Sequence, residues 1–511
     1  MLLHYDYIII GTGAGGGTIA KVLADTGKSI LILERGGFLP QEKENWDSGA
    51  VFQEERYHTK EVWKDKEGND LHPGTGYWIG GNTKVYGAAL FRLRERDFGE
   101  LQHCAGISPS WPLKYDDFEK YYDQAEKLFD VHGKTGEDPT EPFRSEPLPF
   151  EGVADEPRIA DVRTALKNYG LKPFDIPLGI KLNERNRVES LCIKCDTCDG
   201  FPCLLHAKAD ADINCIRPIM HDSNITLMID AMVEKLITNE AGDQIRGVET
   251  VINGEKITFT AETIIVSCGA INSAALFLKS ANEKHPNGLA NKSDQVGRNF
   301  MKHQSAAMLA ISFTENPTKF QKTIALTDFY FGDEDFGFPM GSIQLMGKSN
   351  RYMLTDDAPI FTPVKILSEM AQHSVDWWFT GEDLPDQENR VMWKDGKIHL
   401  NYTINNEEGF DRLIKKFSKI LTELEDDIKF LPENINISKK IPLAGVAHQC
   451  GTLRFGTDPE TSVLDTNCKT HEIDNLYVVD GSFFPSSGAV NPSLTIIANA
   501  IRVGEHLKSL I

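Results

Sequence analysis

Three glycines near the start of the chain, Gly11, Gly13 and Gly16, have the spacing of a turn that binds a diphosphate. Gly11 allows a tight turn, Gly13 lets the backbone approach a pyrophosphate, and Gly16 lets a helix pack closely on the preceding strand. Glu34 follows at about the separation where a carboxylate takes a ribose hydroxyl, and it would repel a ribose 2′-phosphate. Together these residues predict a dinucleotide site.

Four cysteines form a second group with possible chemistry, since Cys192, Cys195, Cys198 and Cys203 follow the pattern C-x2-C-x2-C-x4-C. This spacing is close to that of iron–sulfur ligands, and zinc is a further possibility. Two other interpretations remain open. One is a tight loop with buried thiols or a labile disulfide, and the other is a C-x-x-C redox pair.

His448 and Asn491 are the third group, in the C-terminal part of the chain. A neutral imidazole has an ordinary pKa of about 6.5, so it can accept a proton near neutral pH. An asparagine amide can hydrogen-bond the oxygen that loses the proton. Taken alone, such a histidine is more often a hydrogen-bonded core residue, and such an asparagine more often caps a helix.

The elements around the glycine turn are predicted to alternate between strand and helix. An apolar run over 5–10 precedes the turn, a helix-like stretch over 18–26 follows it, and a second apolar run over 29–33 ends at Glu34. The helix N-terminus would face the phosphates with free N–H groups and the positive end of its dipole.

Further strands are predicted in the middle and near the end of the chain. Alternating runs there suit antiparallel strands, whereas continuous apolar runs suit buried parallel ones. The continuous runs are 263–266 and 477–479, and the latter ends at a polar turn where open α/β sheets bind ligands. A helix over 496–507 is predicted to close the chain. The remaining predicted strands are 225–229, 232–237, 245–251 and 256–260.

The bulk composition excludes several classes of protein. The chain has 511 residues, enough for two or three domains, and a net charge of −21, which disfavours nucleic acid or an anionic membrane as partner. No apolar run has the length of a membrane span. The first strand begins within a few residues of Met1, which predicts no signal peptide and a cytoplasmic location.

Four segments of the chain resemble the glucose–methanol–choline (GMC) family of flavin oxidoreductases, in particular its bacterial sugar- and alcohol-oxidising members. They are the opening unit through Glu34-Arg35-Gly36, the Gly80-Gly81-x5-Gly87 loop, the turn over 267–273, and the C-terminal block that carries His448 and Asn491. The Trp111-Pro112 segment and the 296–303 segment, which ends at His303, add weaker support.

The resemblance implies that the dinucleotide is FAD. Some family members attach FAD covalently to a histidine at the position of Val85, so this residue implies non-covalent binding. The residues that the resemblance and the glycine motif place at the cofactor are Gly11, Gly13, Ala14, Gly15, Gly16, Glu34, Arg35, Gly80, Gly81, Asn82, Thr83, Val85, Tyr86, Val233, Cys268, Gly269, Asp480, Gly481, Asn491, Pro492 and Thr495.

The resemblance also implies a reaction, the oxidation of a CH–OH group to a carbonyl with hydride transfer to flavin N5. His448 would be the base, and Asn491 would hydrogen-bond the same oxygen. A sugar, glycoside or polyol is the expected substrate. A steroid, a long-chain alcohol or an aromatic alcohol remains open. Oxygen, a quinone or a redox protein would accept the electrons.

Four other functions are weaker alternatives. They are a flavin electron-transfer protein with a metal cluster at Cys192–Cys203, a flavin lyase or photoenzyme, a catalytically silent flavin-binding scaffold, and an NAD enzyme. The alcohol-oxidising form of the His448 and Asn491 pair argues against the photoenzyme.

The expected fold is α/β, α+β overall, with a Rossmann-like FAD-binding domain and a second domain built on an antiparallel sheet. The first domain is expected to be discontinuous, over 1–100, 190–300 and 441–511. The substrate-binding domain and its lid segments would take 101–189 and 301–440. Within it, 133–160 is expected to be an exposed loop or lid, and 384–400 to form a hairpin.

Overall fold

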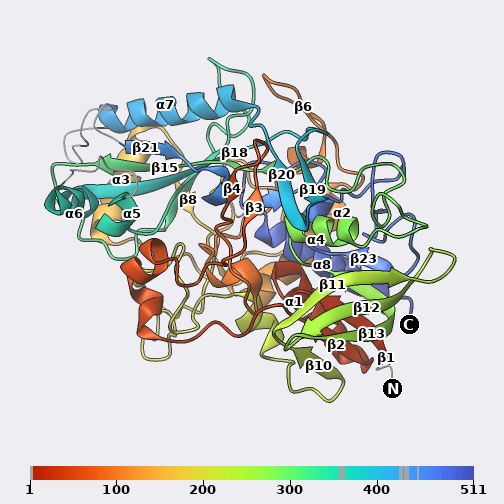
Figure 1. Cartoon of the computed structure of the whole chain (residues 1–511). Helices are drawn as coiled ribbons and strands as arrows, with labels where there is room; N and C mark the ends of the chain where they lie inside the picture. The colour runs from red at the N-terminus through yellow and green to blue at the C-terminus, as the bar shows by residue number, and fades with distance from the viewer. Residues whose placement is uncertain (1–3, 356–362, 425–429, 431–436, 446–447) are drawn as a thin grey trace.

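The computed structural model describes residues 4–355, 363–424, 430, 437–445 and 448–511. Its first layer is a seven-stranded sheet with the strand order β10-β2-β1-β13-β12-β11, in which β23 also pairs with β13 (Figure 1). Five of the strands run parallel, which confirms the Rossmann-like prediction. They are β1 (His4–Ile10), β2 (Ile30–Leu33), β10 (Ile225–Met228), β13 (Glu255–Val266) and β23 (Leu476–Val478).

An antiparallel extension completes this sheet. β11 (Ala231–Thr238) pairs with β12 (Ile245–Ile252), and β12 pairs with the first half of β13. The two runs expected at 256–260 and 263–266 are therefore one strand. Its first half continues the antiparallel meander and its second half joins the parallel core, because Thr260 to Val266 pair with β1.

Three helices follow strands of the parallel core. α1 (Ala14–Leu23) follows β1, α4 (Ala270–Lys279) follows β13, and α8 (Ser493–Lys508) follows the turns after β23. α1 begins four residues before the predicted 18–26 because the glycines themselves form its first turn. α1 packs directly on α8, where a Cβ at Gly504 would lie 2.6 Å from the Val22 side chain.

A six-stranded antiparallel sheet forms the second layer, in the order β21-β15-β18-β17-β16-β8. Figure 1 shows α7 (Glu407–Glu423) lying along this sheet. Trp377 and Phe379 of β18 pack on Phe417 of α7, so alternate residues such as Trp378 face the opposite side of the sheet. The strands are β8 (Phe174–Asp175), β15 (Gln304–Ile311), β16 (Ile324–Leu326), β17 (Ser342–Leu345), β18 (Ser374–Gly381) and β21 (Ile437–Lys440).

The expected hairpin is present as β19 (Arg390–Lys394) and β20 (Lys397–Asn401), but it lies in another sheet. It joins β3 (Trp63–Lys64) and β4 (Asp70–Leu71), and β19 contacts α4. The remaining elements are η1 (Ala24–Thr26), η2 (Lys43–Trp46), η3 (Gly49–Gln53), η4 (Gly81–Lys84), η5 (Glu95–Phe98), β5 (Leu101–Gln102), β6 (Ile107–Ser108), α2 (Tyr115–Leu128), β7 (Val131–His132), α3 (Pro157–Tyr169), β9 (Leu178–Gly179), η6 (Asp212–Ile216), β14 (Met301–Lys302), α5 (Arg351–Thr355), α6 (Val364–His373), η8 (Leu443–Gly445), β22 (Gln449–Cys450) and η9 (Gly481–Phe483).

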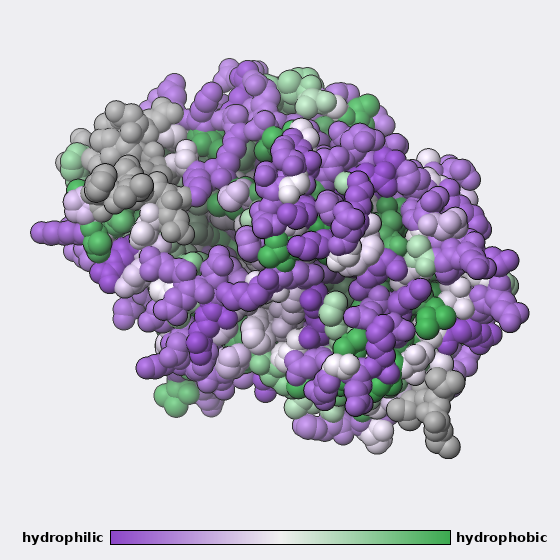
Figure 2. Space-filling model, in the orientation of Figure 1, coloured by the Kyte–Doolittle hydropathy of each residue, from purple (hydrophilic) through white to green (hydrophobic). Residues whose placement is uncertain are grey.

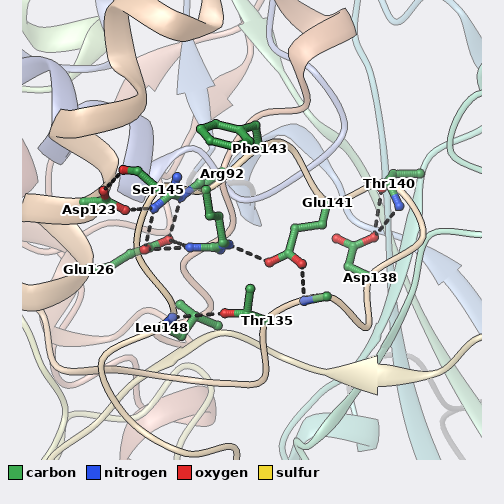
Figure 3. A network of polar contacts seen from close by, with 12 residues as sticks. Arg92, Asp123, Glu126, Thr135, Asp138, Thr140, Glu141, Phe143, Ser145 and Leu148 are labelled. Carbon is green, nitrogen blue, oxygen red and sulfur yellow. Dashed lines mark hydrogen bonds and ion pairs between the residues drawn. The ribbon is translucent and has the colours of Figure 1, made fainter.

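The segment after β7 is irregular up to α3, as expected, but buried ion pairs anchor it. Arg92 contacts both Asp123 and Glu126 of α2 at 2.6 and 2.7 Å. Arg144 of the segment also contacts Glu126, and Ser145 donates to Asp123. Figure 3 shows Arg92, Asp123, Glu126 and Ser145 converging in this way. The segment is therefore tied to α2 rather than free at its centre.

The face of the molecule seen in Figure 2 is mainly polar. Figure 2 shows hydrophilic residues over most of the visible face, with hydrophobic residues in small separate groups. Among the helices of the described residues, none is both long and apolar enough to cross a membrane.

The buried ion network gives a stability prediction. Arg92 has a fully buried side chain, so Arg92→Met would remove the cation from the Asp123 carboxylate and leave Glu126 with Arg144 alone. Breaking a buried ion pair from one side costs about 3–5 kcal/mol, and we expect the free energy of unfolding to fall by that amount. Denaturant titration measures it.

Lys134→Met provides the control, because Lys134 pairs with Glu137 at the surface and its side chain is 66% exposed. Such a pair contributes about 0–1 kcal/mol. Equal losses in the two variants would contradict a stabilising role for the Arg92 network.

Candidate active site

The parallel strands bring three turns together at one edge of the seven-stranded sheet. The turn after β1 packs on the turn after β13, since a Cβ at Gly11 would lie 2.3 Å from the Ser267 carbonyl oxygen. The start of α1 packs on the turn after β23, since a Cβ at Gly15 would lie 1.7 Å from the Val479 carbonyl oxygen. The structure therefore assembles the three sequence-predicted turns in one place.

Two helices begin at this edge without a side-chain cap. Gly13 precedes α1 and Gly269 precedes α4, and neither position supplies a capping side chain. A Cβ at either glycine would meet none of the described atoms within 4 Å, so open space lies in front of each. Uncapped helix N–H groups that face open space suit a phosphate, so the predicted pyrophosphate site fits this geometry.

Glu34, at the end of β2, is buried beside the same turn. Its carboxylate accepts hydrogen bonds from the Thr12 amide at 3.0 Å, the Thr12 hydroxyl at 2.6 Å and the Gly36 amide at 3.1 Å. Burial raises the pKa of Glu34. Thr12 also accepts from the Gly80 amide at 3.1 Å, so it links the first turn to the glycine-rich loop. Thr12 lies inside the glycine motif, which was the only sequence signal for it.

Two basic residues make close contacts among the residues predicted to bind the cofactor. The Arg35 guanidinium stacks on the Tyr77 ring, 3.5 Å from its centroid. Lys279 of α4 donates to the Val233 carbonyl at 3.2 Å. Sequence reasoning named Arg35 and Val233 but missed Tyr77 and Lys279, which no motif marks.

The loop over 80–87 lies directly on the first turn. A Cβ at Gly81 would lie 3.0 Å from the Gly13 Cα, so the two glycines allow the segments to meet. Within the loop, Asn82 accepts from Thr75 at 2.6 Å and Thr83 accepts from the Ala211 amide at 3.0 Å.

Partners of Val85 and Tyr86 come from the cysteine segment and from the residues that follow it. The Tyr86 hydroxyl donates to the Ala209 carbonyl, and the Val85 carbonyl accepts from the Gly200 amide at 3.0 Å. Hydrogen bonds to the segment before the loop and to the cysteine region therefore hold the loop in place.

Asp480, after β23, joins two turns at the same edge. One carboxylate oxygen accepts from the Gly269 amide at 3.0 Å and from Ser273, and the other accepts from the Ser482 amide at 2.9 Å. Burial raises the pKa of Asp480. Its neighbour Gly481 packs on β22, since a Cβ there would lie 2.5 Å from the Gln449 carbonyl oxygen. Cys268 lies beside Gly269, and its amide donates to Ser273.

A short antiparallel pair positions the catalytic candidate His448. Met301 of β14 pairs with Cys450 of β22, and Lys302 pairs with Gln449. The next pair in this register is His303 with His448, and their Nδ1 atoms are 3.0 Å apart. His448 Nε2 lies 3.5 Å from Asn491 Nδ2, so the structure also brings the two catalytic candidates together.

One carbonyl fixes the protonation pattern of these side chains. His303 Nε2 lies 3.1 Å from the Ser487 carbonyl oxygen, which can only accept, so His303 carries its proton on Nε2. His303 Nδ1 is then an acceptor, and His448 must donate from Nδ1. The lone pair of His448 Nε2 is left toward Asn491, as a base requires.

Both histidines are kept neutral by their surroundings. Burial lowers the pKa of His303. Burial, followed by the nearby His303 and the Lys322 cation, lowers the pKa of His448 to well below its ordinary value. His448 is therefore in its proton-accepting form at neutral pH.

Two other predicted residues lie at the start of α8. Pro492 precedes its first residue, and the Thr495 hydroxyl lies 2.8 Å from the Tyr122 hydroxyl. Trp111 donates to the Ser486 hydroxyl at 2.8 Å, so the Trp111 segment supports the turn that ends at Asn491.

The cysteine segment packs beside the 80–87 loop. The described residues, which include all four cysteines, contain no group of three or more His, Cys, Asp or Glu side chains placed to hold a metal ion. Burial raises the pKa of the Cys192 thiol to about 11 and that of Cys198 to about 12, so both are protonated at neutral pH. Lys208 instead donates to the Cys198 and Phe201 carbonyls.

Comparisons with known proteins show what the whole chain is similar to. Models described as GMC oxidoreductase match residues 5–305 and 385–500. The chain is 29% identical to 6′′′-hydroxyparomomycin C oxidase of Streptomyces lividus, over 99% of this chain and 91% of the relative. It is 28% identical to paromamine 6′-oxidase of Streptomyces fradiae, over 98% and 90%. The pyridoxine 4-oxidase structure from Mesorbium loti superposes with a TM-score of 0.70 at 17% identity and 99% coverage of both chains.

The protonation pattern is testable by NMR of ¹⁵N-histidine-labelled protein. At pH 7 we expect His448 to be neutral with its proton on Nδ1. His303→Phe removes the acceptor for that proton, so both tautomers of His448 should then be populated. His506→Phe, in the last turn of α8, is the control and should leave the His448 signals unchanged. An Nε2–H tautomer in the unmodified protein would contradict the assignment.

Proposed function

The chain belongs to the GMC oxidoreductase family, and from this premise we propose that it oxidises a CH–OH group of a sugar, glycoside or polyol to the carbonyl. The observation that carries the proposal is the approach of His448 Nε2 to Asn491 Nδ2 at 3.5 Å, which places an acceptor and a donor side by side. The two relatives named as oxidases of 6′′′-hydroxyparomomycin C and paromamine favour a sugar hydroxyl over a steroid, long-chain or aromatic alcohol.

Members of the family are FAD flavoproteins, and the residues present fit this cofactor. The uncapped starts of α1 and α4 would hold the diphosphate, and Glu34 would take the ribose hydroxyls. Val85 offers no nucleophile for a covalent bond, so we propose that FAD is held non-covalently. When bound, FAD supplies the acceptor for the hydride of the substrate carbon.

His448 and Asn491 act together on the substrate hydroxyl. His448 Nε2 accepts the hydroxyl proton, and Asn491 Nδ2 donates a hydrogen bond to the same oxygen as negative charge develops on it. His303 holds the imidazole of His448 in the required tautomer throughout, because its Nδ1 accepts from His448 Nδ1. It acts on the reaction through His448 and is therefore a positioning residue.

FAD and the substrate would be bound by different parts of the chain, each containing one of the two sheets. We propose that the part built on the seven-stranded sheet, 1–100, 190–300 and 441–511, binds FAD. The part that contains the six-stranded sheet, 101–189 and 301–440, would bind the substrate. The two parts meet at Asn491, because Gln344 of β17 donates to this residue at 3.3 Å.

The first test is the visible spectrum of the purified protein without oxygen, before and after addition of a panel of sugars and alcohols. Flavin bands that bleach with a sugar or polyol are the expected result. We expect His448→Ala to slow this bleaching at least about a hundredfold, since a positioned base contributes on that scale. Bleaching at the unmodified rate in His448→Ala would contradict the assignment of the base.

The pH dependence of kcat/KM is a second test of His448 as the base. Only neutral His448 accepts a proton, so kcat/KM is lost as pH falls through the His448 pKa. Because that pKa lies well below its ordinary value of about 6.5, we expect full kcat/KM at pH 6.5 and a decline only at lower pH. An acid limb centred above pH 6.5 would contradict the lowered pKa.

The mode of FAD attachment is tested by acid denaturation of the holoprotein. Because Val85 cannot form a bond to the flavin, we expect all FAD absorbance in the supernatant after the protein precipitates. Flavin that remains in the washed precipitate would show a covalent link elsewhere in the chain.

A further inference from the structure

Gln344 is a buried polar side chain beside the catalytic candidates. Of its two polar atoms, only one has a hydrogen-bond partner among the described residues. Gln344 lies on β17, is 6% exposed, and donates from Nε2 to Asn491 Oδ1 at 3.3 Å. Its other polar atom, Oε1, is buried and has no hydrogen-bond partner in the described part of the chain. Leaving a buried acceptor unpaired is costly, so this atom points to a ligand.

The orientation of the Gln344 amide follows from the tautomer of His448. Asn491 must present Nδ2 to the lone pair of His448 Nε2, so its Oδ1 faces Gln344. Gln344 must therefore present Nε2 to Asn491, which leaves Oε1 as a free acceptor. The strand register places Trp378 opposite Gln344, so a partly exposed indole stands on the same face of the sheet.

An ion pair stands next to this face. Lys322 has a side chain 4% exposed and contacts Asp199. Asp199 also accepts from the Gly347 amide, three residues after Gln344 on the same segment. A Cβ at Gly87 would lie 2.1 Å from Lys322 Nζ, so the ion pair rests against the end of the 80–87 loop.

The Lys322 charge also contributes, after burial and His303, to the lowered pKa of His448. An ammonium group has three N–H donors, and Asp199 is the hydrogen-bond partner of Lys322 Nζ among the residues that the structure describes. The Gln344 side chain thus lies beside Asn491, and the Lys322 donors belong to the ion pair that contacts Gly347, just after β17. A hydroxyl group both donates and accepts, so it complements this combination.

We propose that Gln344 and Lys322 form a second hydroxyl-binding subsite, which makes the enzyme select substrates that carry a further hydroxyl near the one that is oxidised. The inference rests on the proposed function and assigns its preference for polyhydroxylated substrates to these two residues. When a site hydrogen-bonds a substrate hydroxyl, an analogue without that hydroxyl leaves the polar groups of the site unpaired. Its kcat/KM is then lower, by up to several orders of magnitude.

The test compares flavin bleaching without oxygen by two polyols, glycerol and methyl glucoside, with bleaching by 1-propanol. We expect the unmodified holoenzyme to favour at least one polyol over 1-propanol by a hundredfold or more in kcat/KM. Gln344→Met keeps the length of the side chain but removes Oε1 and also the Nε2 donor to Asn491. It should lower kcat/KM for the polyol at least tenfold more than it lowers kcat/KM for 1-propanol, because only the polyol would use Oε1.

Two further variants separate ligand binding from support of Asn491. Gln344→Glu keeps an acceptor at the end of the side chain but loses the donor to Asn491. It should retain more of the polyol preference than Gln344→Met does. Asn316→Leu is the matched control, because Asn316 is another buried amide, paired with Gln321 and the Ser374 carbonyl. It should leave the ratio of polyol to 1-propanol unchanged.

Each outcome decides one of the two proposals. Equal kcat/KM for polyols and 1-propanol in the unmodified enzyme overturns the subsite and leaves the proposed function standing. If no alcohol bleaches the flavin, the proposed function fails. The subsite is then decided by binding of ¹⁴C-glycerol and ¹⁴C-methyl glucoside in equilibrium dialysis. Binding that Gln344→Met weakens tenfold supports it, and no binding, or equal binding in both proteins, overturns it.

Discussion

The hydrogen bond from His303 Nε2 to the Ser487 carbonyl is the constraint on which the candidate active site depends. A backbone carbonyl has no proton to give, so it fixes the direction of the bond, and each following side chain inherits that direction. Through His303, His448 and Asn491, the same carbonyl determines that Gln344 presents its amide nitrogen to Asn491. One backbone atom thus sets the donor and acceptor pattern from the base to the proposed subsite.

The turn that carries this carbonyl is held by side chains from distant parts of the chain. The Gly488 amide donates to Glu382 at 3.2 Å, and the Ala489 amide donates to the Tyr330 hydroxyl at 2.9 Å. Glu382 is itself held by His103 at 3.0 Å and Ser108 at 2.6 Å. These partners are buried, so the turn cannot rotate without leaving polar groups unpaired. The position of the turn in the C-terminal block therefore depends on side chains next to the six-stranded sheet.

The parts of the molecule that the sequence predicted are those with local causes. A glycine turn between an apolar strand and a helix is encoded within a few residues, so the start of the chain and the meander before β13 could be predicted. The pairing of His303 with His448 could not, because it depends on the register of two short strands far apart in the chain. The buried ion pairs that anchor Arg144 and Ser145 to α2 likewise join residues that share no local pattern, which is why their segment resembled a free lid.

The cysteine-rich segment illustrates how a spacing can suggest one chemistry while the fold uses its neighbours for another. Burial raises the pKa of the Cys192 and Cys198 thiols, so these two are protonated, whereas Asp199, between Cys198 and Gly200, contacts both Lys322 and the Gly347 amide. Gly87 has no room for a side chain because this ion pair lies against it. A larger residue at position 87 would displace Lys322 and Asp199 together and disturb the bond from the Gly347 amide to Asp199. The glycine that ends the loop and the aspartate inside the cysteine pattern are thus two parts of one contact, and the charge of its lysine contributes to the lowered pKa of His448.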